Sequence, residues 1–170
     1  MTEPGAADSA PFPFARGQRL QRSEAHYLLG GNPRAGIANC ADEPFVLLFS
    51  DPGLGEPFGY HVHEGLRSDG VYQFSGEGKR GPQQWVRGNF ALGEAANRQK
   101  SLHLFLPENR HQVYVGEFSL TEQGWHTAVA PDISGQDRLI FIFELVLAHS
   151  GPLNAEYFDR LGLTVSVRTD

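Results

Sequence analysis

The chain has 170 residues, 40% of them hydrophobic, which is enough for one domain with one core. Its formal charge of −6 argues against a protein that binds nucleic acid only through generic phosphate contacts. The single cysteine, Cys40, excludes an internal disulfide. The N-terminus is unlike a signal peptide, and no apolar run has the roughly 20 residues of a membrane span. We therefore expect a cytoplasmic protein with no membrane partner.

The first third of the chain predicts a tail, a helix and a buried strand. Residues 1–15 are rich in Pro, Ala and small polar residues, which is typical of a disordered tail. Residues 16–29 fit a short helix that ends at two glycines, with Leu28 on its apolar face. The uninterrupted apolar run over residues 45–49 indicates a strand buried on both faces.

The rest of the chain predicts further strands and a second helix. A Gly-rich loop over residues 76–81 leads into a helix from Pro82 to about Arg98, in which two glycines weaken the pattern. Runs of β-branched and aromatic residues bounded by turn signals predict the strands. These runs cover residues 58–63, 71–75, 102–106, 113–118, 125–130 and 138–148.

Together these elements predict an α+β fold, in which two short helices pack on a twisted, mainly antiparallel, barrel-like sheet. The functional residues should lie in loops at the rim of this sheet. We place the domain at residues 16–148, after the tail and before a C-terminal extension over residues 149–170.

The residues best suited to a chemical function lie between Phe58 and Leu92. Gly59-Tyr60 is followed by Glu64-Gly65, then by Phe74-Ser75-Gly76-Glu77-Gly78, and then by Asn89-Phe90-Ala91-Leu92. This ordered series resembles the core of SRA (SET- and RING-associated) domains, particularly the bacterial branch associated with modification-dependent (type IV) restriction endonucleases. The resemblance covers roughly residues 16–148 and implies an SRA/PUA-like fold.

The resemblance also implies a binding module and not an enzyme. Such a module binds double-stranded DNA and flips a C5-modified cytosine, 5-methyl- or 5-hydroxymethylcytosine, into an aromatic pocket without a cofactor. Aromatic rings would stack on the base, and an acceptor would bind its N4 amino group. The residues assigned to this base pocket are Tyr60, His61, His63, Glu64, Tyr72, Phe74 and Ser75. The residues assigned to the DNA backbone are Gly76, Gly78, Lys79, Arg80, Arg87 and Asn89.

Glu64 is the first choice for the residue that reads the base edge, although its position departs from the family pattern. The family acid follows the tyrosine by two or three residues, where this chain has Val62 and His63. Either the loop brings Glu64 to the base, or His61 or His63 reads it. The preferred modification therefore stays open. No nuclease motif is present in this sequence, so a nuclease partner would have to supply any cleavage.

A DNA-binding interpretation has to account for the acidic net charge. Six basic residues fall within a stretch of roughly 35 residues, and we expect them to form a locally basic face. They are Arg67, Lys79, Arg80, Arg87, Arg98 and Lys100.

Two other functions remain open at the level of the sequence. His61 and His63 point the same way if they lie on a strand, and could bind one metal ion in a cupin-like small β-barrel protein. Alternatively, the same fold could serve as a nucleic-acid or protein interaction module without base flipping.

Overall fold

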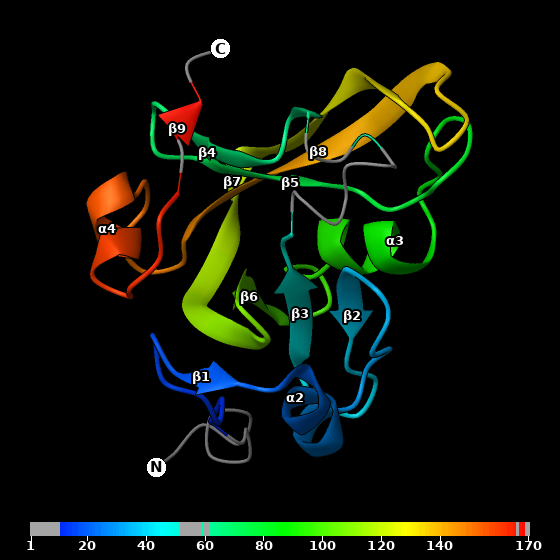
Figure 1. The fold of residues 1–170 in the computed structure, drawn as a ribbon. Coiled ribbons are helices and arrows are strands. Elements are labelled where there is room, and N and C mark those ends of the chain that lie inside the picture. Colours follow the sequence, from blue (N-terminus) through cyan, green and yellow to red (C-terminus); the bar gives the residue numbers. More distant parts are fainter. Residues whose placement is uncertain (1–10, 52–58, 60–61, 166, 169–170) are drawn as a thin grey trace.

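The computed structural model describes residues 11–51, 59, 62–165 and 167–168. These residues form a nine-stranded sheet and three short helices (Figure 1). The helices are α2 (Arg22–Leu29), α3 (Arg87–Gly93) and α4 (Ala155–Asp159). The strands are β1 (Arg19–Leu20), β2 (Ile37–Asn39), β3 (Phe45–Phe49), β4 (Gly65–Arg67), β5 (Tyr72–Ser75), β6 (Ser101–Glu108), β7 (His111–Pro131), β8 (Asp137–Leu147) and β9 (Val167–Arg168).

The sheet has the strand order β2-β3-β6-β7-β8-β5-β4-β9, and β1 pairs with β7. All neighbouring strands are antiparallel except β3 beside β6 and β4 beside β9. β7 pairs with β6 through its first part and with β8 through its second part, so it links the lower and upper halves seen in Figure 1. The expected α+β class with a mainly antiparallel sheet is confirmed. The ordered strand path is open, because its two ends, β2 and β9, are not neighbours.

Strand β3 shows why the sheet has a core on each face. Val46 and Leu48 belong to the main core with β5, β6 and β8, whereas Phe45, Leu47 and Phe49 pack on the other side against α2. Because side chains alternate along a strand, a run of five apolar residues can supply both cores. The predicted strand over residues 45–49, buried on both faces, is confirmed.

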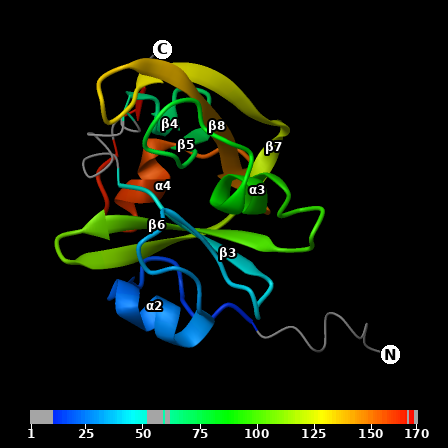
Figure 2. The ribbon, with the colours of Figure 1, turned by 90° about the vertical axis from the view of Figure 1, so that its right-hand side faces the viewer.

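Both expected helices are shorter than the sequence pattern suggested. Arg19–Leu20 forms β1 and pairs with β7, so α2 begins only at Arg22, after the N-cap residue Gln21. Leu28 is 53% exposed, so its placement on the buried face was wrong. Residues 82–84 belong to a loop, and α3 begins only at Arg87. Figures 1 and 2 show α2 below the β3–β6 part of the sheet and α3 between that part and the β5–β8 part.

Both ends of the described chain contribute to the cores. Phe12 and Phe14 pack against the sheet, and the Phe12 ring stacks on His103 with centroids 3.7 Å apart. These two residues fall within the tail that was expected to be disordered. Their aromatic area favours burial over exposure. Phe158 of α4 is buried in the main core with Tyr72. The boundary drawn at residue 148 stays a prediction.

The helices in the described part of the chain are all too short or too polar to cross a bilayer.

Candidate functional site

A cavity of about 560 Å³ opens where α2, the end of β3, β5 and the start of α3 come together. Residue 64 and the loop over residues 76–84 complete its wall. Its volume lies within the range of about 300–1,000 Å³ that is usual for ligand sites. Most of the residues predicted for the pocket and the DNA backbone line this cavity: Glu64, Phe74, Ser75, Gly76, Gly78, Lys79, Arg80, Arg87 and Asn89.

Glu64 is the acid of this cavity, and it is only 7% exposed. The Ser75 backbone N–H donates to its Oε1 at 2.9 Å, and the Ser50 hydroxyl donates to its Oε2 at 2.6 Å. Burial, with a smaller contribution from Asp51, raises the pKa of Glu64 to about 7. The hydrogen bonds from Ser50 and Ser75 hold the side chain in one orientation and favour its charged form, but burial disfavours the charge more strongly.

The loop over residues 76–84 is fixed to the protein by buried polar side chains. Asn89 is 1% exposed; it accepts from the Glu77 backbone N–H and donates to the carbonyls of Glu77 and Gln84. Because both amide hydrogens of Asn89 are used, the structure gives it a role in holding the loop rather than a phosphate. Gln83 donates to the Gly76 carbonyl at 2.7 Å and accepts from the Phe141 N–H at 2.8 Å.

The turn between β7 and β8, together with the start of β8, holds the same loop from its other side. Asp132 accepts from the Gly81 N–H at 3.0 Å, and Arg138 donates to the carbonyls of Gly78 and Gly81. A side chain at Gly76 would displace the two amides that hold the loop, because a Cβ there would lie 2.7 Å from Gln83 Oε1 and 2.8 Å from Asn89 Oδ1. The loop is therefore preorganised without a ligand, so binding would order few further residues.

Cationic side chains line the cavity from two sides. Lys79, Arg80 and Arg87 come from the loop and the start of α3, and Arg22 and Arg34 come from α2 and the segment after it. Three acidic side chains, Asp51, Glu64 and Glu77, also line the cavity, so cations are in excess on a chain whose net charge is −6. A locally basic site thus exists, but only part of the basic stretch in the sequence forms it.

The remaining basic residues of that stretch serve other contacts or lie elsewhere. Arg67 pairs with Asp69 and Glu144, and Lys100 donates to Asn39 and to the Cys40 carbonyl. Arg98 lies over the Phe90 ring. None of the three lines the cavity, because nearness in sequence does not place side chains on one face.

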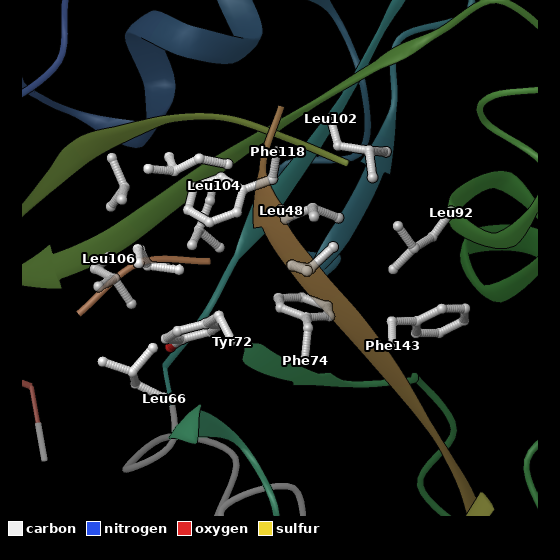
Figure 3. Packing of buried hydrophobic residues seen from close by; sticks show 14 of the residues in the cluster. Leu48, Leu66, Tyr72, Phe74, Leu92, Leu102, Leu104, Leu106, Phe118 and Phe143 are labelled. Carbon is white, nitrogen blue, oxygen red and sulfur yellow. The ribbon is translucent and has the colours of Figure 1, made fainter. Parts of the chain in front are cut away.

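Two aromatic residues predicted as stacking walls belong to the core. Figure 3 shows Tyr72 and Phe74 on the same side of β5, among buried leucines and Phe143. Phe74 lines the cavity although it is only 3% exposed. Tyr72 does not line it; instead its hydroxyl lies 2.6 Å from the hydroxyl of Ser50, which bonds Glu64. Tyr72 therefore supports the acid rather than stacking on a ligand.

Two further predicted residues, Tyr60 and His61, lie outside the described residues, so the second aromatic wall stays a prediction. His63 does not line the cavity, because its ring nitrogen Nε2 lies 2.9 Å from the Val129 carbonyl on β7. Glu64 and His63 are the described candidates for reading the base edge. The fold places Glu64 at the cavity and directs the His63 ring to β7.

Sequence reasoning missed the far side of the cavity, to which Arg22, Arg34, Phe49 and Ser50 belong. No motif marks these residues, which share the cavity with Glu64 only through the tertiary structure. The Phe49 ring is not free to stack on a ligand. Phe105 stacks on it with centroids 4.9 Å apart, and the Arg22 guanidinium lies 3.9 Å from its centroid.

Solved structures with the same fold are SRA domains. One of them contains the sulfur-binding and SRA domains of ScoMcrA complexed with phosphorothioated DNA. Its match covers 92% of this chain, with a TM-score of 0.62 and 18% identity. The SRA domain of SUVH5 in complex with hemimethylated CG DNA gives a TM-score of 0.58 at 18% identity, over 86% of this chain and 97% of that one. The SUVH5 SRA domain bound to fully hydroxymethylated CG DNA gives a TM-score of 0.54 at 22% identity. This match covers 79% of this chain and 89% of that one.

The class defined by fold and site is therefore the SRA domain. A sequence model of the family described as "ScoMcrA-like, SRA domain" matches residues 16–159, and the chain belongs to this family. No curated protein matches the chain. The chain spans 48% of the ScoMcrA chain that holds the sulfur-binding and SRA domains. It spans 33% of the chain in the structure of the type IV phosphorothioation-dependent restriction endonuclease ScoMcrA.

This membership gives the chain a different fold from the cupin-like alternative. Within the described ranges, no three His, Cys, Asp or Glu side chains are grouped as a metal site would require. Since His61 lies outside those ranges, the family assignment rather than this observation decides the fold.

Proposed function

We propose that the chain binds double-stranded DNA that contains a C5-modified cytosine, with the modified base turned out of the helix into the cavity beside Glu64. The chain then acts as a binding module, and cleavage of DNA would belong to a nuclease partner. The family assignment supports this function, as do the printed descriptions of the SUVH5 domains, which are bound to methylated and hydroxymethylated DNA.

The observation that carries the proposal is a buried acceptor at an open cavity of suitable size. Glu64 is held by Ser50 and Ser75, and its cavity also has Phe74 in its wall. A cytosine that leaves the stack needs a partner for its N4 amino group, which a carboxyl oxygen supplies. Tyr60, which the sequence places next to this site, is proposed as the ring that stacks on the base, worth about 1–3 kcal/mol.

The cations at the cavity would hold the DNA backbone on either side of the flipped nucleotide. Arg34 is exposed on one side, and Lys79, Arg80 and Arg87 are exposed on the other. Phosphate contacts position a duplex without reading its sequence. Contacts from both sides would therefore straddle the base that enters the cavity.

Binding to a set of matched duplexes tests the function. We expect the protein to bind duplexes with one 5-methyl- or 5-hydroxymethylcytosine more tightly than the unmodified duplex and a phosphorothioated duplex. Glu64→Ala and Tyr60→Ala should remove this preference, because they act on the base. Lys79→Ala, Arg80→Ala and Arg34→Ala should weaken binding to all duplexes alike and flatten the salt dependence.

Arg160→Ala is the matched control for the arginine variants, because Arg160 is exposed directly after α4, pairs with Glu156 and does not line the cavity. Equal affinity for modified and unmodified duplexes would contradict the proposed function. So would equal losses on both duplexes from the Glu64 and Arg80 variants.

A further inference from the structure

The second part of β7 forms an edge of the sheet. Its pairing with β6 ends at Phe118, and from Ser119 to Pro131 it pairs with β8. Among the strands that the structure describes, no other strand pairs with these residues. Figure 2 shows this part of β7 (yellow) on the outside of the molecule, with β8 (orange) on its inner side. One side of this strand is therefore open to a further strand.

The backbone groups of Trp125 and Thr127 point to this open side. Thr127 lies directly opposite Phe141 of β8. The Phe141 N–H and C=O bond the loop residues Gln83 and Gly76, so they do not bond β7. In an antiparallel ladder, opposite residues exchange both of their hydrogen bonds or neither. The backbone groups of Thr127, and those of Trp125 two residues earlier, therefore point away from β8. Within the described ranges, no other group bonds them.

This edge lacks the features that usually prevent strand pairing. Proteins protect an exposed edge with charged side chains, proline or a bulge, because its unpaired backbone groups can bind another strand. Residues 124–130 include no charged residue and no proline, and the bulge in β7 comes before Trp125. Trp125 is 39% exposed although it also packs on Trp85. The Val129 carbonyl accepts from His63, so the open stretch ends before Val129.

The open stretch is complementary to itself. An antiparallel pairing about a two-fold axis at His126 places Trp125 of each copy opposite Thr127 of the other. Each N–H of these two residues then meets a carbonyl of the other copy. The two Trp125 rings lie on the same face and diagonal to each other, within reach of aromatic side chains. Two chains that each carry a net charge of −6 repel elsewhere, but this stretch brings no like charges together.

We propose that two copies of the chain form a dimer by antiparallel pairing of their β7 edges, centred on His126. This inference goes beyond the proposed function and does not depend on it. None of residues 119–131 lines the cavity beside Glu64, so pairing leaves both cavities open.

Analytical ultracentrifugation of the full chain without DNA tests the dimer. We expect a reversible equilibrium between monomer and dimer over about 5–500 µM, because a short edge contact gives a small and weak interface. A monomer at all these concentrations would overturn the proposal. Because DNA is absent, this outcome would leave the proposed function unaffected.

Charges at position 127 test the register of the pairing. Thr127 is exposed, so Thr127→Lys and Thr127→Glu should fold, with melting temperatures close to that of the wild type. Each variant alone places like charges diagonally across the two-fold axis and should raise the dissociation constant by about tenfold or more. An equal mixture of the two variants places opposite charges there and should restore the association.

Ser23→Lys is the matched control, because Ser23 is exposed on α2, at the other end of the molecule in Figure 1. It adds the same charge and should dimerise like the wild type. A dimer that Thr127→Lys leaves unchanged, or a mixture that associates no better than either variant alone, would overturn the proposed pairing. The concentration series of the wild type uses no substitution, so it remains decisive if a variant fails to fold.

Discussion

At the scale of single residues, Glu64 couples the site to the stability of the protein. Its pKa is raised from 4.5 to about 7 in the folded chain, chiefly by burial. Between these two values the folded state binds more protons than the unfolded state, so the free energy of unfolding falls as the pH rises from about 4.5 to 7. The contribution is about 3 kcal/mol over the whole window. Burial of Glu64 thus makes the folded protein more stable at a pH where this residue is neutral.

Glu64→Gln should remove this pH dependence, because the amide does not ionise. We expect the variant to gain stability relative to the wild type as the pH rises from 5 to 8. Thermal melts of both proteins at several pH values measure the difference. A difference in melting temperature that stays constant, or that shrinks with rising pH, would contradict the burial of a neutral acid.

Arg87 is a second cavity residue that lowers the stability of the protein, here through its backbone conformation. Its φ of 51° lies in the left-handed region at the first residue of α3, where it lines the cavity. This conformation costs a side-chain-bearing residue about 1 kcal/mol relative to glycine. Strain of this kind is found mainly at functional sites, which agrees with the proposed role of the Arg87 cation in binding DNA.

Arg87→Gly and Arg87→Ala separate the strain from the charge. Both remove the cation and should weaken DNA binding to a similar degree. Only glycine relieves the backbone, so Arg87→Gly should be more stable than Arg87→Ala by about 1 kcal/mol in chemical denaturation. Equal stability of the two variants would show that the backbone at this position is not strained.

At the scale of elements, the loop over residues 76–84 is the part of the site that depends most on the rest of the fold. It is fixed from α3 by Asn89, from the β7–β8 turn by Asp132 and from the start of β8 by Arg138. The backbone conformation of this loop could not be predicted from the sequence, because the groups that fix it lie up to 60 residues away along the chain.

Asn89→Ala should release this loop. The change leaves three backbone groups of residues 77 and 84 without their side-chain partner, which costs about 2–4 kcal/mol. We expect a lower melting temperature and weaker binding of modified DNA. Asn97→Ala is the control, because Asn97 is exposed and bonds only the Glu94 side chain among the described contacts. Similar effects from both variants would argue against a role for the loop.

The elements also show how far a sequence can be read. The strands were predictable where apolar runs are long, as at residues 45–49 and 138–147, because burial on one or both faces leaves a clear pattern. Helices were overestimated, since Arg19–Leu20 form a strand and residues 82–86 form a loop. The acid was identified, whereas Arg22, Arg34 and Ser50 were not, because only the tertiary structure brings them to the same cavity.

At the scale of the whole molecule, one bent sheet brings distant segments to a single cavity. β7 pairs with β6 and then with β8, which places the β3 end with Ser50 opposite β5 with Ser75. The acidic net charge and the cationic cavity are compatible, because a local excess of cations can steer DNA to one face while the remainder repels it.

The central claim is that one modified base occupies the cavity beside Glu64, and the fluorescence of 2-aminopurine next to that base tests it most directly. Flipping the cytosine unstacks its neighbour, so we predict a rise in fluorescence when the wild-type protein binds a methylated duplex. Gly36→Trp should abolish the rise, because Gly36 lines the cavity, a Cβ there makes only an ordinary contact at 3.8 Å, and a large side chain would occupy space that the base needs. Tight, selective binding with no change in fluorescence, or with an equal change in Gly36→Trp, would contradict the account.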